Sequence, residues 1–169
     1  MNQFDAASFL AHALAFETEA AERYDDLADT METHNNAEVA ELFRRMANFS
    51  RMHADAVKGR AAGTELPHFK PWEFQWKDAE GPEVAPVERT HYLMTPYHCL
   101  QLALHNERRG RDFYREVSAA NTDAEVKRLA DQMAEEEQDH VLVLEAWLAR
   151  TPEPQPDWDQ DLDPPTVAD

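Results

Sequence analysis

Glycine and cysteine are scarce in this sequence, and both shortages limit the folds it can adopt. Only four glycines occur in 169 residues, which argues against a loop-rich β-sandwich. The single cysteine, Cys99, excludes an internal disulfide, and no CxxC pair exists for a zinc ribbon or a four-cysteine iron site. We expect Cys99 to be a small buried side chain rather than a nucleophile, because no His–acid pair is placed for it.

Basic residues and long apolar runs are also lacking. The 34 acidic residues outnumber the 16 basic ones, and the formal net charge of −18 would repel a phosphate backbone or an anionic membrane. No window approaches the ~18 apolar residues of a membrane span. The N-terminus has no basic start, and Asp5, His12 and Glu17 interrupt its apolar residues, so we expect no signal peptide. The sequence predicts a soluble cytoplasmic protein that binds neither nucleic acid nor membrane.

Helical periodicity is what the sequence does contain. Apolar residues recur at spacings of three and four, which is typical of one buried helix face. We expect helices over about 5–32, 36–59, 95–120 and 123–150. Residues that favour N-cap positions precede three of them, at Asn36, Thr95 and Asp123. Pro96 suits a first helical position, and Gly59 suits a C-terminal stop.

The links between these helices differ in length, and this predicts the topology. Short links at 34–35 and 121–122 favour two antiparallel helical hairpins. The long segment 60–94 joins them, and a crossover along the bundle would explain its length. We expect its aromatic residues to pack on the bundle or on a partner subunit: Phe69, Trp72, Phe74 and Trp76. The fold class is therefore all-α, an antiparallel four-helix bundle over 1–150, followed by an acidic, proline-rich tail at 151–169 that we expect to be disordered.

The two halves of the chain repeat each other. Residues 37–53, laid over 124–140 without a gap, match at seven positions. Generic helical patterning explains matched alanines and leucines, but it does not readily explain matched functional residues. These are the pairs Glu17/Glu107, Tyr24/Tyr114 and His53/His140. A repeated hairpin gives the bundle an approximate two-fold axis, and a site on that axis would take ligands from both halves.

Carboxylates and histidines fall on the predicted core faces of the helices. Glu137 and His140 form a Glu-x-x-His, and residues three apart share a helix face. Glu17 and Glu107 each interrupt an apolar face, where an unpaired carboxylate would be costly. A divalent or trivalent cation shared between them would keep several carboxylates buried together. Alone, the Glu-x-x-His is a weak signal, and its simpler interpretation is a solvated face.

In chain order these positions resemble a known ligand pattern. They read Glu17, Ser50-x-x-His53, Glu107 and Glu137-x-x-His140. Carboxylate-bridged di-iron proteins of the ferritin-like kind use Glu, Glu-x-x-His, Glu, Glu-x-x-His in their four helices. The resemblance covers about 9–148 and is closest to the rubrerythrin branch. Five of the six ligand positions match, and Ser50 stands where the family has a bridging carboxylate.

The resemblance implies a ferritin-like bundle that binds metal. Its ligands would be Glu17, His53, Glu107, Glu137 and His140. The implied cofactor is iron, and manganese or zinc would also suit this nitrogen and oxygen donor set. The implied activity is that of an oxidoreductase of the peroxidase or ferroxidase type, acting on peroxide or oxygen. Because no CxxC is present, electrons would have to come from a separate donor protein.

Three neighbours of these ligands complete the predicted site. Tyr24 and Tyr114 are expected to orient the carboxylates through hydrogen bonds, or else to be core aromatics with satisfied hydroxyls, and Ser50 lies beside the ligands. Ser50 leaves open whether the site holds two ions weakly, one ion or none.

Two other functional interpretations remain open. One is iron binding or storage without turnover. The other is a structural or interaction bundle with a degenerate site, in which Arg111, one turn after Glu107, neutralises that carboxylate. We expect a homodimer from the aromatic content of the crossover. The other histidines show no paired spacing and are expected at surface or loop positions: His12, His34, His68, His91, His98 and His105.

Overall fold

The computed structural model describes residues 3–70, 73–74 and 95–156. In these ranges the chain forms helices and no strands. The helices are α1 (Ala6–Thr33), α2 (Ala37–Arg60), α3 (Pro96–Ala120) and α4 (Ala124–Ala149). Every helix begins and ends within one residue of the predicted boundary. The all-α fold class is confirmed.

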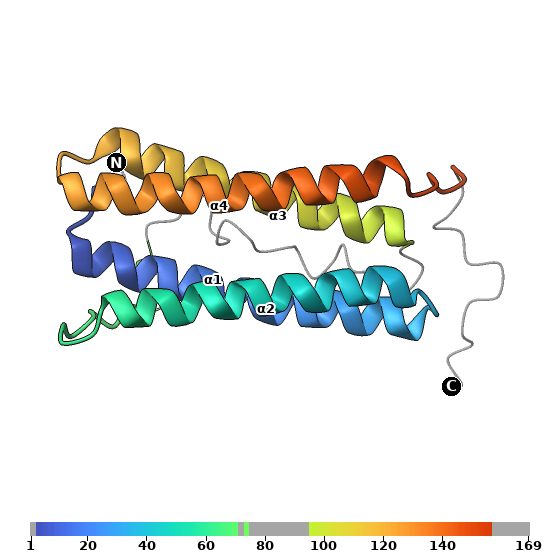
Figure 1. The fold of residues 1–169 in the computed structure, drawn as a ribbon, viewed down its shortest axis with the longest axis horizontal. Coiled ribbons are helices and arrows are strands. Elements are labelled where there is room, and N and C mark those ends of the chain that lie inside the picture. Colours follow the sequence, from blue (N-terminus) through green and yellow to red (C-terminus); the bar gives the residue numbers. More distant parts are fainter. Residues whose placement is uncertain (1–2, 71–72, 75–94, 157–169) are drawn as a thin grey trace, which may run out of the picture.

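Two helical hairpins make up the bundle. Figure 1 shows α1 beside α2 and α3 beside α4, with the two pairs lying along each other. The close backbone contacts fall mainly within each pair. The first turn is tight because Asn35 takes a left-handed conformation with φ of 57°, which asparagine tolerates better than most residues. The predicted antiparallel neighbours are therefore the ones observed.

Side-chain caps fix three of the four helix starts. Asp5 accepts a hydrogen bond from the Ser8 amide at 2.7 Å, and Asp123 accepts one from the Glu125 amide at 2.9 Å. Thr95 caps α3 as predicted. Asn36 occupies the N-cap position of α2 as predicted, and its side chain makes no capping hydrogen bond. Its left-handed neighbour in the turn determines the backbone path there instead.

The apolar core is divided into two clusters along the bundle. The first cluster includes Tyr24, Leu27, Met31, Phe43, Met46, Leu100, Leu104, Val141 and Leu144. The second includes Phe9, Ala13, Phe16, Val57, Phe113, Val117, Val126, Leu129 and Met133. On all four helices the two clusters are separated by a polar position near the middle of the helix. We call these four positions the polar layer: Glu17 on α1, Ser50 on α2, Glu107 on α3 and Glu137 on α4.

His12 is buried, which corrects the prediction that it lies at the surface. It is fully buried on α1, and its Nδ1 donates to the Ser8 carbonyl at 2.8 Å. Its ring contacts Phe69 and Phe74, each with centroids 5.0 Å apart. The start of the crossover thus packs on the bundle. Trp72 and Trp76 lie outside the described residues, as do most of the crossover and positions 157–169 of the predicted tail.

None of the helices in the described part of the chain is long and apolar enough to serve as a membrane span.

Candidate metal centre

Three buried carboxylates face one another in the middle of the bundle. Glu17, Glu107 and Glu137 are each only 1 % exposed, and they come from three different helices. Burial of an ionised carboxylate is costly unless it gains hydrogen bonds or opposite charge. The predicted core faces of α1, α3 and α4 are thus confirmed. The charge of these buried carboxylates must be compensated by hydrogen bonds or by opposite charge.

The second hairpin brings three potential ligands together. Glu107, Glu137 and His140 each offer one donor atom, and these atoms lie within 4.8 Å of one another. His140 Nδ1 is 3.3 Å from Glu107 Oε2. Burial opposes ionisation of Glu107, but hydrogen bonds with Glu137 and His140 outweigh it and hold the pKa of Glu107 below its ordinary value. Glu107 is therefore a charged oxygen donor.

The first hairpin supplies a matching but smaller half-site. Glu17 Oε2 lies 3.6 Å from His53 Nδ1, as Glu107 lies near His140 in the repeat. Burial raises the pKa of Glu17, His53 opposes this shift, and the nearby charge of Glu107 adds to it. Glu17 Oε1 is buried and has no hydrogen-bond partner among the described residues. A buried carboxylate oxygen in this state is suited to bind a cation.

The two histidines lie side by side where the hairpins meet. The rings of His53 and His140 are nearly parallel, with centroids 5.6 Å apart and an interplanar angle of 13°. The carboxylate of Glu17 raises the pKa of His53. Burial lowers the pKa of His140, but the charge of Glu107 outweighs it and the net shift is upward. Both shifts favour the protonated imidazoles, whose charge offsets that of the carboxylates, and metal binding would displace those protons.

Tyr24 connects the two hairpins at this centre. Its hydroxyl, on α1, donates a hydrogen bond to Glu107 on α3. This is the orienting contact that the sequence predicts for Tyr24. Tyr114 is fully buried, and its ring contacts Phe16 with centroids 5.2 Å apart. The predicted orienting bond of Tyr114 stays a prediction.

Ser50 makes the two half-sites unequal. It is buried at 2 % exposure in the polar layer, at the place where the repeat puts Glu137 in the other hairpin. A hydroxyl brings no negative charge. The second hairpin therefore offers two carboxylates and an imidazole, whereas the first offers one of each.

Arg111 does not act as the counter-ion of Glu107. Its guanidinium contacts Asp112 Oδ1 at 2.9 Å and donates to Gln138 Oε1 at 3.0 Å. The charge on Glu107 is compensated by the tyrosine and histidine described above. The proposed internal neutralisation by Arg111 is therefore wrong.

Gly110 allows the helices to approach closely beside the centre. A Cβ atom at this position would lie 2.4 Å from Phe16 Cζ and 3.4 Å from Glu137 Oε2. Any larger side chain must displace the phenyl ring. Glycine here keeps Phe16 and Glu137 in contact with α3.

Glu136 belongs to the surroundings of the centre, although the sequence interpretation missed it. Its Oε2 lies 3.6 Å from His53 Nε2, and its side chain is 32 % exposed. A sequence signal does exist, because Glu136 precedes His140 by four residues and so shares its helix face. The Glu-x-x-His spacing of the ligand pattern does not include it.

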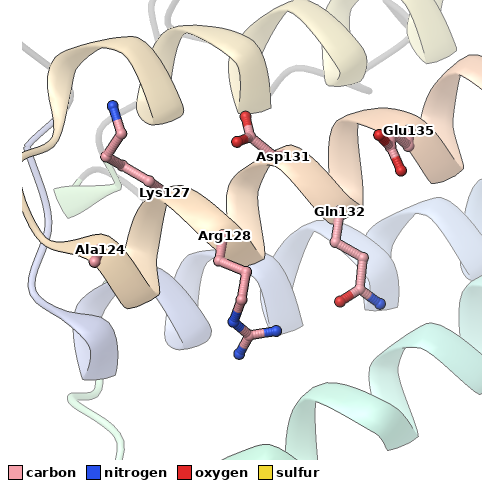
Figure 2. A pocket seen from close by; sticks show the side chains of 6 residues that line it. All are labelled: Ala124, Lys127, Arg128, Asp131, Gln132 and Glu135. Atoms are coloured by element: carbon pink, nitrogen blue, oxygen red, sulfur yellow. The ribbon is translucent and has the colours of Figure 1, made fainter.

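A hollow on the outside of α4 lies apart from this centre. Figure 2 shows its lining, which comes from the first half of α4 and includes Lys127, Arg128, Asp131 and Glu135. Its two basic residues come before its two acidic residues along α4, and it contains none of the predicted ligands. Cys99 is buried, as the sequence predicts, and burial raises the pKa of its thiol to about 12.

The residues present fit a metal ion. Three carboxylates and two imidazoles give a mixed oxygen and nitrogen donor set, which suits iron, manganese or zinc. Glu17 Oε1 is a buried carboxylate oxygen that has no hydrogen-bond partner among the described residues. The five predicted ligands, Glu17, His53, Glu107, Glu137 and His140, all lie in or beside the polar layer.

Comparisons with known proteins agree with this arrangement. The family model described as Rubrerythrin matches residues 8–68, and that described as Ferritin-like domain matches residues 96–168. A crystal structure of an uncharacterized conserved protein from Magnetospirillum magnetotacticum MS-1 is 49 % identical, with a TM-score of 0.78. The match covers 90 % of this chain and 99 % of that one. No curated protein matches the sequence.

Proposed function

Because the chain belongs to the rubrerythrin-like branch of the ferritin-like superfamily, we propose that it binds iron in its polar layer and acts as an oxidoreductase on peroxide or oxygen. The observation that carries this proposal is the convergence of Glu107, Glu137 and His140 inside an apolar core. Burial of these carboxylates in an apolar core without a cation would cost free energy.

Different residues of the protein would have different roles in such a centre. Glu107, Glu137 and His140 would hold one ion, and Glu17 and His53 would hold a second. Tyr24 orients Glu107 by its hydrogen bond. The apolar clusters on either side exclude water from the layer. Bound iron supplies one-electron redox chemistry.

Electrons for turnover would come from a separate protein. The sequence contains no CxxC that would hold an iron donor in the same chain. A homodimer remains a prediction, to be checked by light scattering on the purified protein.

Metal content is the direct test of this proposal. The protein, purified without chelator and then loaded anaerobically with Fe(II), would be analysed for metal beside Glu137→Ala and Glu135→Ala. Glu135 is exposed on the same helix, so its variant is a charge-matched control. We expect iron in the wild type and the control, and loss of iron in Glu137→Ala. Wild-type protein without iron after loading would contradict the proposal.

A structural bundle is the second candidate, and one observation favours it. Each histidine lies beside a carboxylate of its own hairpin, so two protonated imidazoles can offset part of the charge of the three carboxylates without metal. This candidate predicts the same free energy of unfolding with and without a chelator. The iron-binding proposal predicts a lower value with the chelator, because a bound ligand stabilises the native state.

A further inference from the structure

We propose that Glu136 positions His53 for the ion of the first hairpin, by accepting a hydrogen bond from Nε2 so that Nδ1 is left to bind metal beside Glu17. This inference rests on the proposed function, because it concerns how one half of that centre is completed. Glu136 lies outside the ligand pattern that identifies the centre.

The two nitrogens of His53 face different carboxylates. Nδ1 lies 3.6 Å from Glu17 Oε2, and Nε2 lies 3.6 Å from Glu136 Oε2. Glu17 is 1 % exposed and contributes a buried oxygen without a hydrogen-bond partner in the described chain, whereas Glu136 is about a third exposed. The metal side of the ring is therefore the Nδ1 side. Nε2 is left for the outer carboxylate.

A chain of hydrogen bonds holds Glu136 in place. Arg60 on α2 donates to Gln132 Oε1 at 2.9 Å, and Gln132 Nε2 donates to Glu136 Oε1 at 3.1 Å. One oxygen of Glu136 is thus occupied by Gln132, and the other faces His53. The distance to His53 is a few tenths of an ångström longer than a hydrogen bond. A small side-chain rotation would close it.

The half-site of the first hairpin is the one that a positioning carboxylate would strengthen. Ser50 brings no charge where the second hairpin has Glu137, so the first hairpin offers only Glu17 and His53. A carboxylate behind a ligating imidazole fixes its tautomer and makes the ligating nitrogen more basic. Glu136 comes from α4, so the ion of the first hairpin would depend on residues of both hairpins.

The test is a titration of the metal-free protein with Co(II), followed by visible absorption and calorimetry. The variants are Glu136→Ala, Glu136→Gln and, as the control with the same charge change, Glu135→Ala. Glu135 lines the outer hollow of Figure 2 and lies outside the centre. We expect Glu136→Ala to lower the affinity for the more weakly bound Co(II) ion about 10- to 100-fold. The affinity for the more tightly bound ion should not change. Glu136→Gln, which keeps an oxygen acceptor, should recover most of the affinity.

A second readout follows the tautomer of His53 directly. In the Zn(II)-loaded protein, nitrogen NMR should show His53 protonated at Nε2, and Glu136→Ala should change the Nε2 signal without changing the fold. Equal Co(II) affinities in Glu136→Ala and wild type, or equal losses in Glu136→Ala and Glu135→Ala, would overturn the inference and leave the proposed function intact. Wild-type protein that binds no Co(II) would overturn both.

Discussion

The hydroxyl of Tyr24 donates to the carboxylate of Glu107, and the two side chains belong to different hairpins. Tyr24→Phe removes this donor while the ring still fills its place in the first apolar cluster. Because the hydrogen bond helps to keep Glu107 ionised, the pKa of Glu107 should rise in the variant. We expect a loss of about 1–3 kcal/mol in the free energy of unfolding, measured in urea at neutral pH. Tyr97→Phe, at the start of α3, is the control; equal losses in both variants would contradict a specific role for Tyr24.

Ser50→Glu should restore the carboxylate that the repeat places opposite Glu137. Without metal it adds a buried charge to the polar layer, so we expect the free energy of unfolding to fall by about 1–3 kcal/mol. With Co(II) or Fe(II) the variant should bind the second ion more tightly than wild type and regain stability. Ser50→Ala is the neutral control. A variant that is equally unstable with and without metal would argue against a ligand position at residue 50.

Gly110→Ala should destabilise the protein even though alanine favours helix. The new methyl would lie 2.4 Å from Phe16 Cζ, and displacement of that ring should cost about 1–3 kcal/mol. Gly59→Ala is the matched helical control, because nothing lies within 4 Å of a Cβ there. That variant should gain up to about 1 kcal/mol. Chemical denaturation of both variants measures the contrast, and a stabilised Gly110→Ala would show that the contact relaxes freely.

His12 should make the protein less stable in acid. Burial lowers the pKa of His12, although its hydrogen bond to Ser8 partly opposes this. In the unfolded chain the imidazole takes up a proton as the pH falls through about 6.5, whereas in the folded protein it resists doing so. The stabilisation is therefore complete above pH ~6.5 and is lost as the pH falls toward the folded pKa.

His12→Gln measures this contribution. Unfolding in urea between pH ~7.5 and ~5.5 should show a smaller loss of stability in His12→Gln than in wild type. His34→Gln, at the exposed end of α1, is the control and should follow wild type. The comparison must be made against wild type, because the raised pKa values of His53 and His140 stabilise the protein in acid and act in the opposite direction. Parallel curves for His12→Gln and wild type would contradict the prediction.

Periodicity was sufficient to predict the helices, because the spacing of apolar residues follows directly from helix geometry. The polar layer was also predictable, since Glu17 and Glu107 each break an apolar face and recur at equivalent places in the repeat. The spacing of residues in the sequence could not show which residue each charged side chain contacts. Arg111 lies one turn from Glu107 in sequence, yet its planar guanidinium contacts Asp112 and Gln138.

The environments of two further residues were not predicted, because tertiary contacts create them. His12 is buried because Phe69 and Phe74, far along the chain, pack against it, and no local pattern encodes that contact. Glu136 reaches His53 from another hairpin, and the distance between α2 and α4 cannot be read from either segment. Each miss concerns a side chain whose environment is created by a segment distant in sequence.

The division of the bundle into two helical hairpins has a kinetic consequence. Close backbone contacts are formed mainly between α1 and α2 and between α3 and α4, which are neighbours in sequence. Local contacts of this kind close small loops and so form early in folding. The ligands, in contrast, come from all four helices and meet only when the hairpins dock. We expect the hairpins to assemble rapidly without metal, and the donor set to be completed in the final docking step.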